Sequence, residues 1–348
     1  MNEVEVLDLV VAICVAFTTP GAMDPSSDPE LKPASMSGVV FLTRGVSSGF
    51  AAAQRIDGAG PALDSSKASA EHDAFVSLLR ARGPPESTVL ELDADPAHPD
   101  CVFVEDTLVA IPGQGVFACS PHDTRRGEVP PVADAATQIR WDFPGPVVLD
   151  GSADPDAGER IEGGDVLYIR GGDDVFHHFL VGVGNRSNPA GADALRRALR
   201  ASAQRTRAED PHERLFRVHE VDLAGTGWLH LKSAVTWVPY VGFLATDAAC
   251  PVLERVAACL AEFEATTTNR LRSCAEGATV VPRAAANALP LPGGVVLTHP
   301  DAAEKVRERA PRHVDVVGVE QPELARADGA LTCGVVVLDP FFSWRSFS

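Results

Sequence analysis

The chain has 348 residues, a formal net charge of −18 and 45% hydrophobic residues. This length is sufficient for one large domain or two ordinary ones, and it can bury a sizeable core. The acidic balance, without long runs of lysine or arginine, argues against nucleic acid and an anionic membrane surface as partners. The seven cysteines, an odd number with no C-x-x-C pair, indicate neither a disulfide framework nor a zinc cluster. They favour a reducing, cytoplasmic compartment.

The first 36 residues differ in composition from the rest of the chain. The run Leu7 to Phe17 is apolar but too short to span a bilayer, and its acidic neighbours are not typical of a secretory signal. Pro20 to Pro33 has the composition of a flexible linker. We expect residues 1–36 to be a dispensable extension, or a wrongly assigned start with Met36 as the true first residue. An N-terminal anchor is the alternative.

From residue 37 onwards, short apolar runs alternate with amphipathic segments, which predicts an α/β fold with mixed sheets. The expected helices are 70–82, 192–207, 252–263 and 302–309, with a further helix or loop within 122–140. The expected strands are 39–43, 89–92, 102–104, 108–111, 116–119, 147–149, 166–169, 179–183, 217–221, 234–238, 240–244, 278–281, 295–298, 314–319 and 335–338.

Cys333 stands between a glycine-containing turn and the buried run Val335 to Leu338, which places this thiol at the edge of a strand. His230 and the cluster Glu162-Gly-Gly-Asp165 lie far upstream. An acid, a histidine and a cysteine in this order can supply a thiol nucleophile, its acid–base partner and an orienting carboxylate. A lone cysteine in apolar surroundings is, however, more often a small buried hydrophobic residue.

Two acidic clusters lie at the ends of predicted strands. Glu105 and Asp106 follow an apolar run, and Glu162 to Asp165 precedes another. Burying such carboxylates is costly unless a cation compensates them, so together they favour a pocket for a delocalised cation such as guanidinium. Arg125 and Arg186 lie in loops, where they are either ordinary surface charge or capture a carboxylate. Guanidinium at one end and carboxylate at the other describe an arginine-like molecule.

Other motifs are weaker. Gly45-Val-Ser47-Ser-Gly49 matches a serine nucleophile elbow, but the helix that should follow is cut short, so a Gly/Ser loop is the commoner interpretation. His177-His178 is an isolated pair without a convincing set of metal ligands around it. No P-loop, H-E-x-x-H or G-x-G-x-x-G motif is present.

Short motifs follow one another along about residues 38 to 340. They are Asp100-Cys-Val-Phe-Val-Glu-Asp106, Arg125-Arg-Gly-Glu-Val129, Glu162-Gly-Gly-Asp-Val166, Val183-Gly-Asn-Arg186, Leu229-His-Leu-Lys-Ser233, Ala285-Ala-Asn287 and Leu331-Thr-Cys333. This ordered set resembles dimethylarginine dimethylaminohydrolase, of the pentein superfamily. The resemblance implies a single catalytic domain, residues 37–345, built as an α/β-propeller of five ββαβ-type modules around a pseudo-five-fold axis.

The resemblance also implies an activity: hydrolysis of asymmetric dimethylarginine or monomethylarginine to L-citrulline and dimethylamine or methylamine. By this analogy Cys333 attacks the guanidinium carbon, His230 is the acid and base, and Glu162 orients His230. The implied substrate contacts are Glu105 and Asp106 to the guanidinium, Arg125 and Arg186 to the α-carboxylate, Asp100 to the α-amine, and the backbone of Ala327. The substrate is a small molecule, no cofactor or metal is required, and zinc could inhibit by binding Cys333 and His230.

The chain departs from the family in its first 36 residues, in insertions around 134–160 and 203–215, and at 45–66, where the family has its substrate lid. Several alternatives therefore stay open. They are an arginine deiminase-like hydrolase of unmethylated arginine or another guanidino compound, a binding or regulatory protein, and a serine hydrolase built on Ser47. A papain-like protease is disfavoured because Cys333 follows His230. The preference between mono- and dimethylated substrates and the oligomeric state also stay open.

Overall fold

The computed structural model describes residues 38–55, 60–111, 115–139, 147–148, 153–169, 176–206, 215–239, 241–246, 250–261, 278–282 and 285–339. The chain divides into two units, residues 1–34 and 35–348, and all of the described residues belong to the second. The predicted extension, residues 1–36, lies outside the described residues, as does most of the predicted insertion at 203–215.

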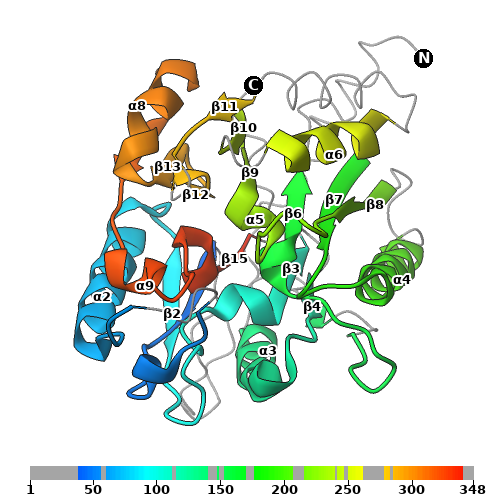
Figure 1. The fold of residues 1–348 in the computed structure, drawn as a ribbon, viewed down its shortest axis with the longest axis horizontal. Coiled ribbons are helices and arrows are strands. Elements are labelled where there is room, and N and C mark those ends of the chain that lie inside the picture. Colours follow the sequence, from blue (N-terminus) through cyan, green and yellow to red (C-terminus); the bar gives the residue numbers. More distant parts are fainter. Residues whose placement is uncertain are drawn as a thin grey trace, which may run out of the picture. The chain divides into compact units, whose positions relative to one another are not determined.

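The described residues contain five three-stranded sheets, and all five share one pairing pattern (Figure 1). In each, the central strand pairs antiparallel with one neighbour and parallel with the other. With the central strand in the middle, the sheets are β15 (Val336–Leu338), β1 (Val40–Arg44), β2 (Thr88–Leu92); β3 (Leu108–Ile111), β4 (Gly115–Ala118), β5 (Val147–Val148); β6 (Val166–Ile169), β7 (Phe176–Val183), β8 (Leu215–Asp222); β9 (Val235–Val238), β10 (Gly242–Ala245), β11 (Thr279–Val280); and β12 (Ala288–Leu291), β13 (Val295–Thr298), β14 (Asp315–Gly318).

A helix lies between the two parallel strands of every sheet, because parallel neighbours require a crossover connection. These helices are α2 (Ser65–Arg82), α3 (Val129–Gln138), α4 (Pro189–Thr206), α6 (Cys250–Ala261) and α8 (Pro300–Arg309). Figure 1 shows them towards the periphery, with the strands further in. None of the described helices combines the length and apolar character needed to cross a bilayer. The expectation of an α/β fold with mixed sheets is confirmed.

Short helical turns contain, or are directly preceded by, most of the predicted site residues. They are η1 (Phe50–Ala52), η2 (Val104–Thr107), η3 (Asp123–Glu128), η4 (Gly163–Asp165), α5 (Leu231–Ala234), α9 (Pro322–Ala325) and η7 (Leu331–Gly334). Four of these turns are followed directly or within one residue by a strand, so the sheets fix their positions. The side chains they carry therefore start from rigid backbone.

Three expectations need correction or comment. The predicted strand 102–104 is wrong, because this segment leads into the helical turn η2, which holds Glu105 and Asp106. Strand β12 was not expected. Ser47, the candidate elbow nucleophile, is fully buried, and its hydroxyl donates to the backbone oxygen of Asp95 at 2.8 Å. This arrangement agrees with a structural Gly/Ser loop.

Candidate active site

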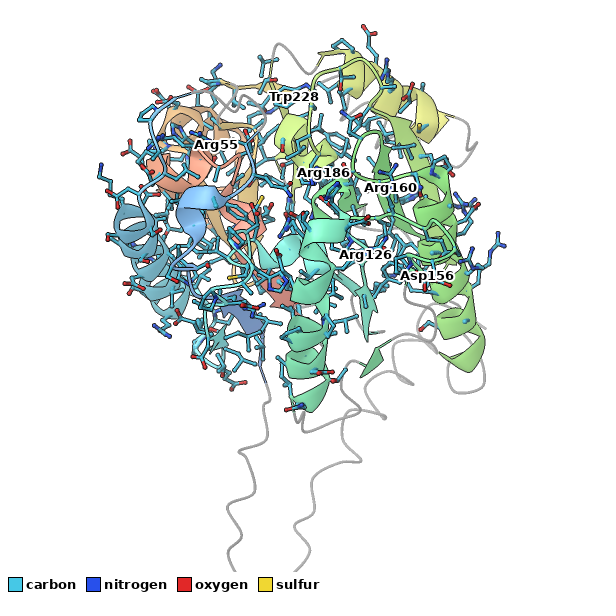
Figure 2. The ribbon with its side chains drawn as sticks, turned by 60° about the horizontal axis from the view of Figure 1, so that its bottom comes forward. Arg55, Arg126, Asp156, Arg160, Arg186 and Trp228 are labelled. Carbon is cyan, nitrogen blue, oxygen red and sulfur yellow. The ribbon has the colours of Figure 1, made fainter. Side chains whose placement is uncertain are left out.

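One pocket of the described structure, about 310 Å³ in volume, gathers most of the predicted site residues. Figure 2 labels Arg55 and Arg186, two of its lining residues from distant parts of the sequence. The full lining is Gln54, Arg55, Asp100, Phe103, Asp106, Arg125, Arg186, Leu229, His230, Ala327, Asp328, Gly329 and Cys333. All of the predicted site residues except Glu105 and Glu162 therefore line one pocket.

Cys333 lies in η7, which is separated from β15 by the single residue Val335, and its backbone N–H donates to the oxygen of Ala330 at 3.0 Å. Its side chain is buried in an apolar cluster that includes Phe103 and Ala327. Because β15 pairs with β1, the sheet holds the thiol at the wall of the pocket. The predicted place of Cys333 at the edge of a strand is close to what the structure shows.

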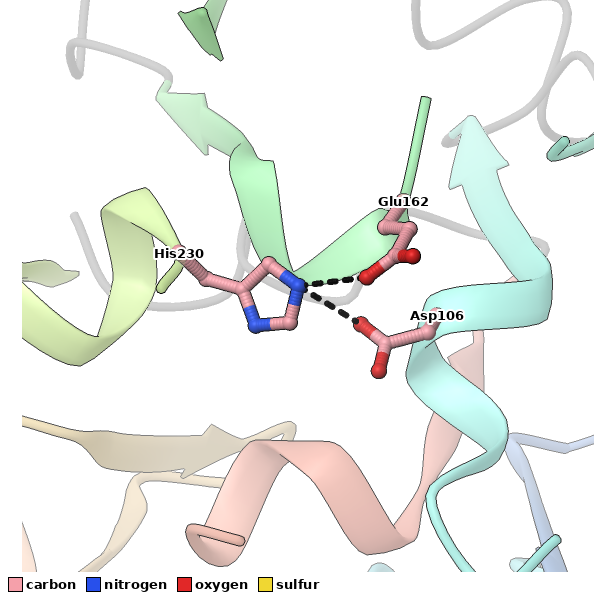
Figure 3. A group of neighbouring side chains, drawn as sticks. All are labelled: Asp106, Glu162 and His230. Atoms are coloured by element: carbon pink, nitrogen blue, oxygen red, sulfur yellow. Dashed lines mark hydrogen bonds and ion pairs between the residues drawn. The ribbon is translucent and has the colours of Figure 1, made fainter. Parts of the chain in front are cut away.

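His230 precedes α5, whose first backbone N–H, that of Leu231, donates to Asp165 Oδ1 at 2.9 Å. The imidazole Nε2 lies 2.6 Å from Glu162 Oε2 and 3.8 Å from Asp106 Oδ1 (Figure 3). Figure 3 shows the two carboxylates converging on the same ring nitrogen. The histidine and the acid that the sequence placed far apart therefore form a buried pair.

Electrostatics favours the charged form of both members of this pair. Burial alone would lower the pKa of His230, but the carboxylates of Asp106, Glu162 and Asp165 outweigh burial and raise it to about 9. Burial opposes ionisation of Glu162 too, yet the His230 hydrogen bond and charge hold its pKa at about 2. At neutral pH the pair is an imidazolium and a carboxylate.

The two glycines between Glu162 and Asp165 are required by close packing. A Cβ at Gly163 would overlap the backbone oxygen of Glu105, and one at Gly164 would lie 2.8 Å from Asp106 Oδ1 and 2.9 Å from His230 Nδ1. The backbone N–H of Gly164 donates to Asp106 Oδ1 at 3.1 Å. Glycine therefore allows η4 to approach η2 closely enough for both acidic clusters to meet at His230.

Arg125 lies in η3, and its buried guanidinium is already surrounded by acceptors. Nη1 donates to Asp106 Oδ2 at 2.6 Å, Nη2 donates to Glu128 Oε2 at 2.7 Å and to the backbone oxygen of Phe103 at 3.0 Å, and Nε also donates to Glu128. Burial opposes the charge of Arg125, but these two carboxylates raise its pKa well above the ordinary value. Sequence reasoning did not identify Glu128 as the second acid of this group.

Glu105 is not among the residues that line the pocket. Its Oε1 accepts from Lys232 Nζ at 2.6 Å, and its Oε2 accepts from the Thr332 hydroxyl at 2.8 Å. Asn287 accepts from the backbone N–H of Thr332 at 3.1 Å and donates to its hydroxyl at 3.0 Å. Glu105 therefore supports the turn that carries Cys333, and its contact with a guanidinium stays a prediction.

At the other side of the pocket, Asp100, Arg186 and Gln54 form a connected group. Asp100 Oδ1 accepts from the Gln54 backbone N–H at 3.0 Å, and the Gln54 side-chain oxygen accepts from Arg186 Nη2 at 2.8 Å. Burial raises the pKa of Asp100, against the opposing charges of Arg125 and Arg186. Gln54 lies in the segment 45–66, where the sequence departs from the family it resembles, so no motif could identify it.

The pocket's acids do not favour a free thiolate. Desolvation, together with the carboxylates of Glu105 and Asp106, raises the pKa of Cys333 well above the ordinary value for a thiol. A cation placed between the acids and the sulfur would reverse the effect of those carboxylates. The arrangement therefore suits reaction with a positively charged group more than with a neutral one.

Asp106, Glu162 and His230 each offer a ligand atom within 4.8 Å of the others, so they could also hold a metal ion. Their mutual hydrogen bond and ion pair already compensate these charges without one. The predicted inhibitory zinc, on Cys333 and His230, involves a different pair of ligands and stays a prediction.

No family model matches the chain. An N(G),N(G)-dimethylarginine dimethylaminohydrolase of Streptomyces coelicolor is 32% identical over 182 residues, which are 51% of this chain and 56% of that relative. The match thus spans little more than half the length of the curated relative.

Solved structures extend the likeness over most of the chain. A dimethylarginine dimethylaminohydrolase of Pseudomonas aeruginosa, a cysteine-to-serine variant complexed with citrulline, is 20% identical, with a TM-score of 0.63 over 87% of this chain and 100% of that chain. The N-terminal domain of ArgZ, a cyanobacterial arginine dihydrolase bound to substrate, is 14% identical, with a TM-score of 0.59 over 86% of this chain and 98% of that chain. The chain shares their fold, and the resemblance stated from its motifs is confirmed.

Proposed function

We propose that the protein is a hydrolase that converts Nω-methylated arginine to L-citrulline and methylamine or dimethylamine. The observation that carries the proposal is that Cys333 lines one pocket with His230, whose imidazole is hydrogen-bonded to Glu162 behind it. The pocket also presents Asp106, and its acidity suits a guanidinium. The named relative of 32% identity supports the same reaction.

The chemistry follows from charge and position. Binding of the guanidinium beside Asp106 places positive charge near Cys333, which lowers the cost of releasing the thiol proton to water. The sulfur then bonds to the guanidinium carbon, and His230 gives its proton to the departing amine as the C–N bond breaks. Water attacks the resulting S-alkylthiouronium while His230 accepts a proton from the water. The C–S bond then breaks, the proton left on the new C–OH group passes to the departing sulfur, and citrulline is released with the Cys333 thiol restored.

Glu162 contributes by holding His230 in the charged, correctly oriented form. A histidine whose pKa is about 9 is protonated at neutral pH and can therefore act as a proton donor. After the amine has left with the proton, the neutral imidazole is a strong base beside Glu162, ready to activate water. General acid–base assistance of this kind contributes on the order of 10²–10⁴ in rate.

The remaining predicted residues are proposed as substrate contacts. Asp106 binds the guanidinium, Asp100 binds the α-amine, Arg186 binds the α-carboxylate and the backbone of Ala327 adds a contact. All four line the pocket. Arg125 was predicted to bind the carboxylate and Glu105 to bind the guanidinium. The geometry supports these two roles less well, because the side chains of both residues already form hydrogen bonds with other side chains.

Turnover of three substrates tests this function. Asymmetric dimethylarginine is expected to give citrulline and dimethylamine in equal amounts, monomethylarginine to give citrulline and methylamine, and arginine to release little ammonia. Cys333→Ser is the control and is expected to give none of these products. Preferred release of ammonia from arginine would support the deiminase alternative, which the likeness to the arginine dihydrolase favours. Failure to form citrulline from any of the three would contradict the proposal.

We further propose that residues 37–345 form one cytoplasmic catalytic domain of five modules around a pseudo-five-fold axis, and that residues 1–36 are a dispensable extension. The repeated sheet pattern, with a helix before every parallel strand, supports the modular arrangement.

A further inference from the structure

The two members of the proposed acid–base pair belong to separate segments, and one buried carboxylate contacts both segments. Glu162 stands directly before η4, and His230 stands directly before α5. Asp165 is the last residue of η4, and its side chain is buried. It does not line the pocket, so it does not contact the substrate there.

One oxygen of Asp165 holds the segment of His230. Asp165 Oδ1 accepts from the backbone N–H of Leu231, the residue after His230, at 2.9 Å. Gly182 of β7 makes room for this contact, since a Cβ there would lie 2.8 Å from Asp165 Oδ1 and 2.9 Å from the Leu231 Cβ. The backbone that carries the imidazole is therefore attached directly to Asp165.

The other oxygen holds the segment of Glu162 through a fully buried serine. The Ser187 hydroxyl donates to Asp165 Oδ2 at 2.6 Å and accepts from the backbone N–H of Glu162 at 3.0 Å. A hydroxyl can donate one hydrogen bond while it accepts another, so both contacts form at the same time. Asp165 also donates its own backbone N–H to the oxygen of Glu162 at 3.0 Å.

A carboxylate suits this place better than an amide would. Leu231 and Ser187 each bring a donor, so both oxygens of the side chain at position 165 have to accept. An asparagine has a single acceptor oxygen and would direct its NH₂ group at one of these donors. Asp165 therefore joins the two segments in a way that its nearest isostere does not.

We propose that Asp165 and Ser187 are positioning residues, which hold Glu162 and His230 at hydrogen-bonding distance for the proton transfers of the reaction. This inference rests on the proposed function. The bond that they maintain, from His230 Nε2 to Glu162 Oε2, is 2.6 Å long. A hydrogen bond of this kind weakens steeply when its distance and angle change, so small shifts of either segment reduce the orienting effect of Glu162.

Ser187→Ala is the first test, and Ser120→Ala is its matched control. Ser120 is a buried serine beside the same segment, because its backbone N–H donates to the oxygen of Ile161 at 3.1 Å. Its hydroxyl has no hydrogen-bond partner among the described residues. Ser187→Ala is expected to lower kcat for Nω,Nω-dimethylarginine roughly tenfold and to change KM less than about twofold. Ser120→Ala is expected to leave both constants unchanged.

Asp165→Asn and Ser187→Thr complete the set. Asp165→Asn is expected to lower kcat at least as much as Ser187→Ala, and Ser187→Thr to restore part of kcat because it keeps the hydroxyl. The proposal is overturned if Ser187→Ala and Ser120→Ala have the same kcat, or if the loss lies in KM. Lower stability in urea with an unchanged kcat would show a merely structural role and overturns it too. If either Ser187→Ala or Asp165→Asn does not fold, the other decides.

Proton NMR separates this inference from a failure of the proposed function, because it needs no turnover. The Nε2 proton of His230, in a 2.6 Å bond to a carboxylate, is expected to resonate at low field at pH 7, assigned by its loss in His230→Gln. The signal is expected to stay in Ser120→Ala and to move upfield or vanish in Ser187→Ala and Asp165→Asn. That change would support the inference even if the wild type converts neither methylated arginine. No such signal in the wild type, or an unchanged signal in both variants, would reject it even if turnover is observed.

Discussion

At the scale of single residues, the site depends on a competition between burial and charge at His230. A buried imidazole ordinarily loses its proton, because burial disfavours the charged form. Three surrounding carboxylates reverse this preference and move the pKa of His230 to about 9. Desolvation, together with the carboxylates of Glu105 and Asp106, raises the pKa of the Cys333 thiol and favours its protonated form. Without a bound cation, the proposed proton donor is therefore charged and the proposed nucleophile is a neutral thiol.

The shifted pKa values predict how stability depends on pH. Because the pKa of His230 is raised from 6.5 to about 9, its stabilisation is fully present below pH 6.5 and is lost as pH rises through 9. That loss is on the order of 3 kcal/mol in the free energy of unfolding. On the acid side, the lowered pKa of Glu162 predicts a further loss as pH falls from 4.5 towards 2.

Urea unfolding of wild type and Glu162→Gln across this pH range measures the effect. Glu162→Gln removes one of the carboxylates that hold the proton on His230, so the decline between pH 6.5 and 9 is expected to shrink. An identical decline in both proteins would show that the pair does not cause it.

Lys232 gives a second residue-scale prediction. Its ammonium compensates Glu105, and both side chains are at least 85% buried. Lys232→Met leaves Glu105 as an unpaired buried charge, with an expected cost of about 3 kcal/mol in unfolding free energy. Because Glu105 also binds Thr332, beside Cys333, we expect kcat to fall as well.

The double variant Lys232→Met with Glu105→Gln serves as the control, since it removes both charges. It is expected to recover most of the stability in chemical unfolding. A double variant as unstable as Lys232→Met would mean that the ion pair is not the source of the loss.

At the scale of elements, two short turns meet without side chains between them. The turn η4, led by Glu162, packs directly on η2, and Gly163 faces the backbone oxygen of Glu105. Asp165 then ties η4 to its surroundings by accepting from the Ser187 hydroxyl at 2.6 Å and from the Leu231 backbone N–H at 2.9 Å. Burial raises the pKa of Asp165 to about 6, and these hydrogen bonds oppose the shift. The relative position of Glu162 and His230 thus depends on backbone packing.

Gly163→Ala tests this contact. The added methyl group has to displace backbone, so we expect a loss of roughly 1–3 kcal/mol in unfolding free energy and a lower kcat. Gly334→Ala is the matched control, because its Cβ would lie 3.5 Å from the Phe75 ring, an ordinary contact. Equal stabilities of the two variants would indicate that η4 can move away from η2.

At the scale of the whole molecule, the spacing of apolar residues along the sequence predicted the helices and strands that bury one face in the core. Helix α2 and strand β1 were expected nearly where they lie, because their apolar residues follow a helical or a buried-strand pattern. Strand β12 was missed because Pro290 lies within it, and proline is acceptable there since β12 is at the edge of its sheet. The segment 102–104 was mistaken for a strand because its apolar residues are buried in a turn.

For the site, too, the sequence predicted some features and missed others: it predicted which residues belong to the site but not how their charged groups pair. Motif order assigned Cys333, His230 and Asp106 to one site, and all three residues line the same pocket. The partners of each charged group could not be predicted, because Arg125 contacts Asp106, and Gln54 contacts Asp100, only once distant segments are folded together. These pairings depend on tertiary packing that no local pattern records.

Rapid-quench mass spectrometry of the intact protein during turnover of Nω,Nω-dimethylarginine tests the central claim most directly. We expect a covalent species whose added mass equals the substrate minus dimethylamine, located on the peptide that contains Cys333 and absent in Cys333→Ser. Citrulline formation that continues undiminished in Cys333→Ser, or an adduct carried by another residue, would contradict the account.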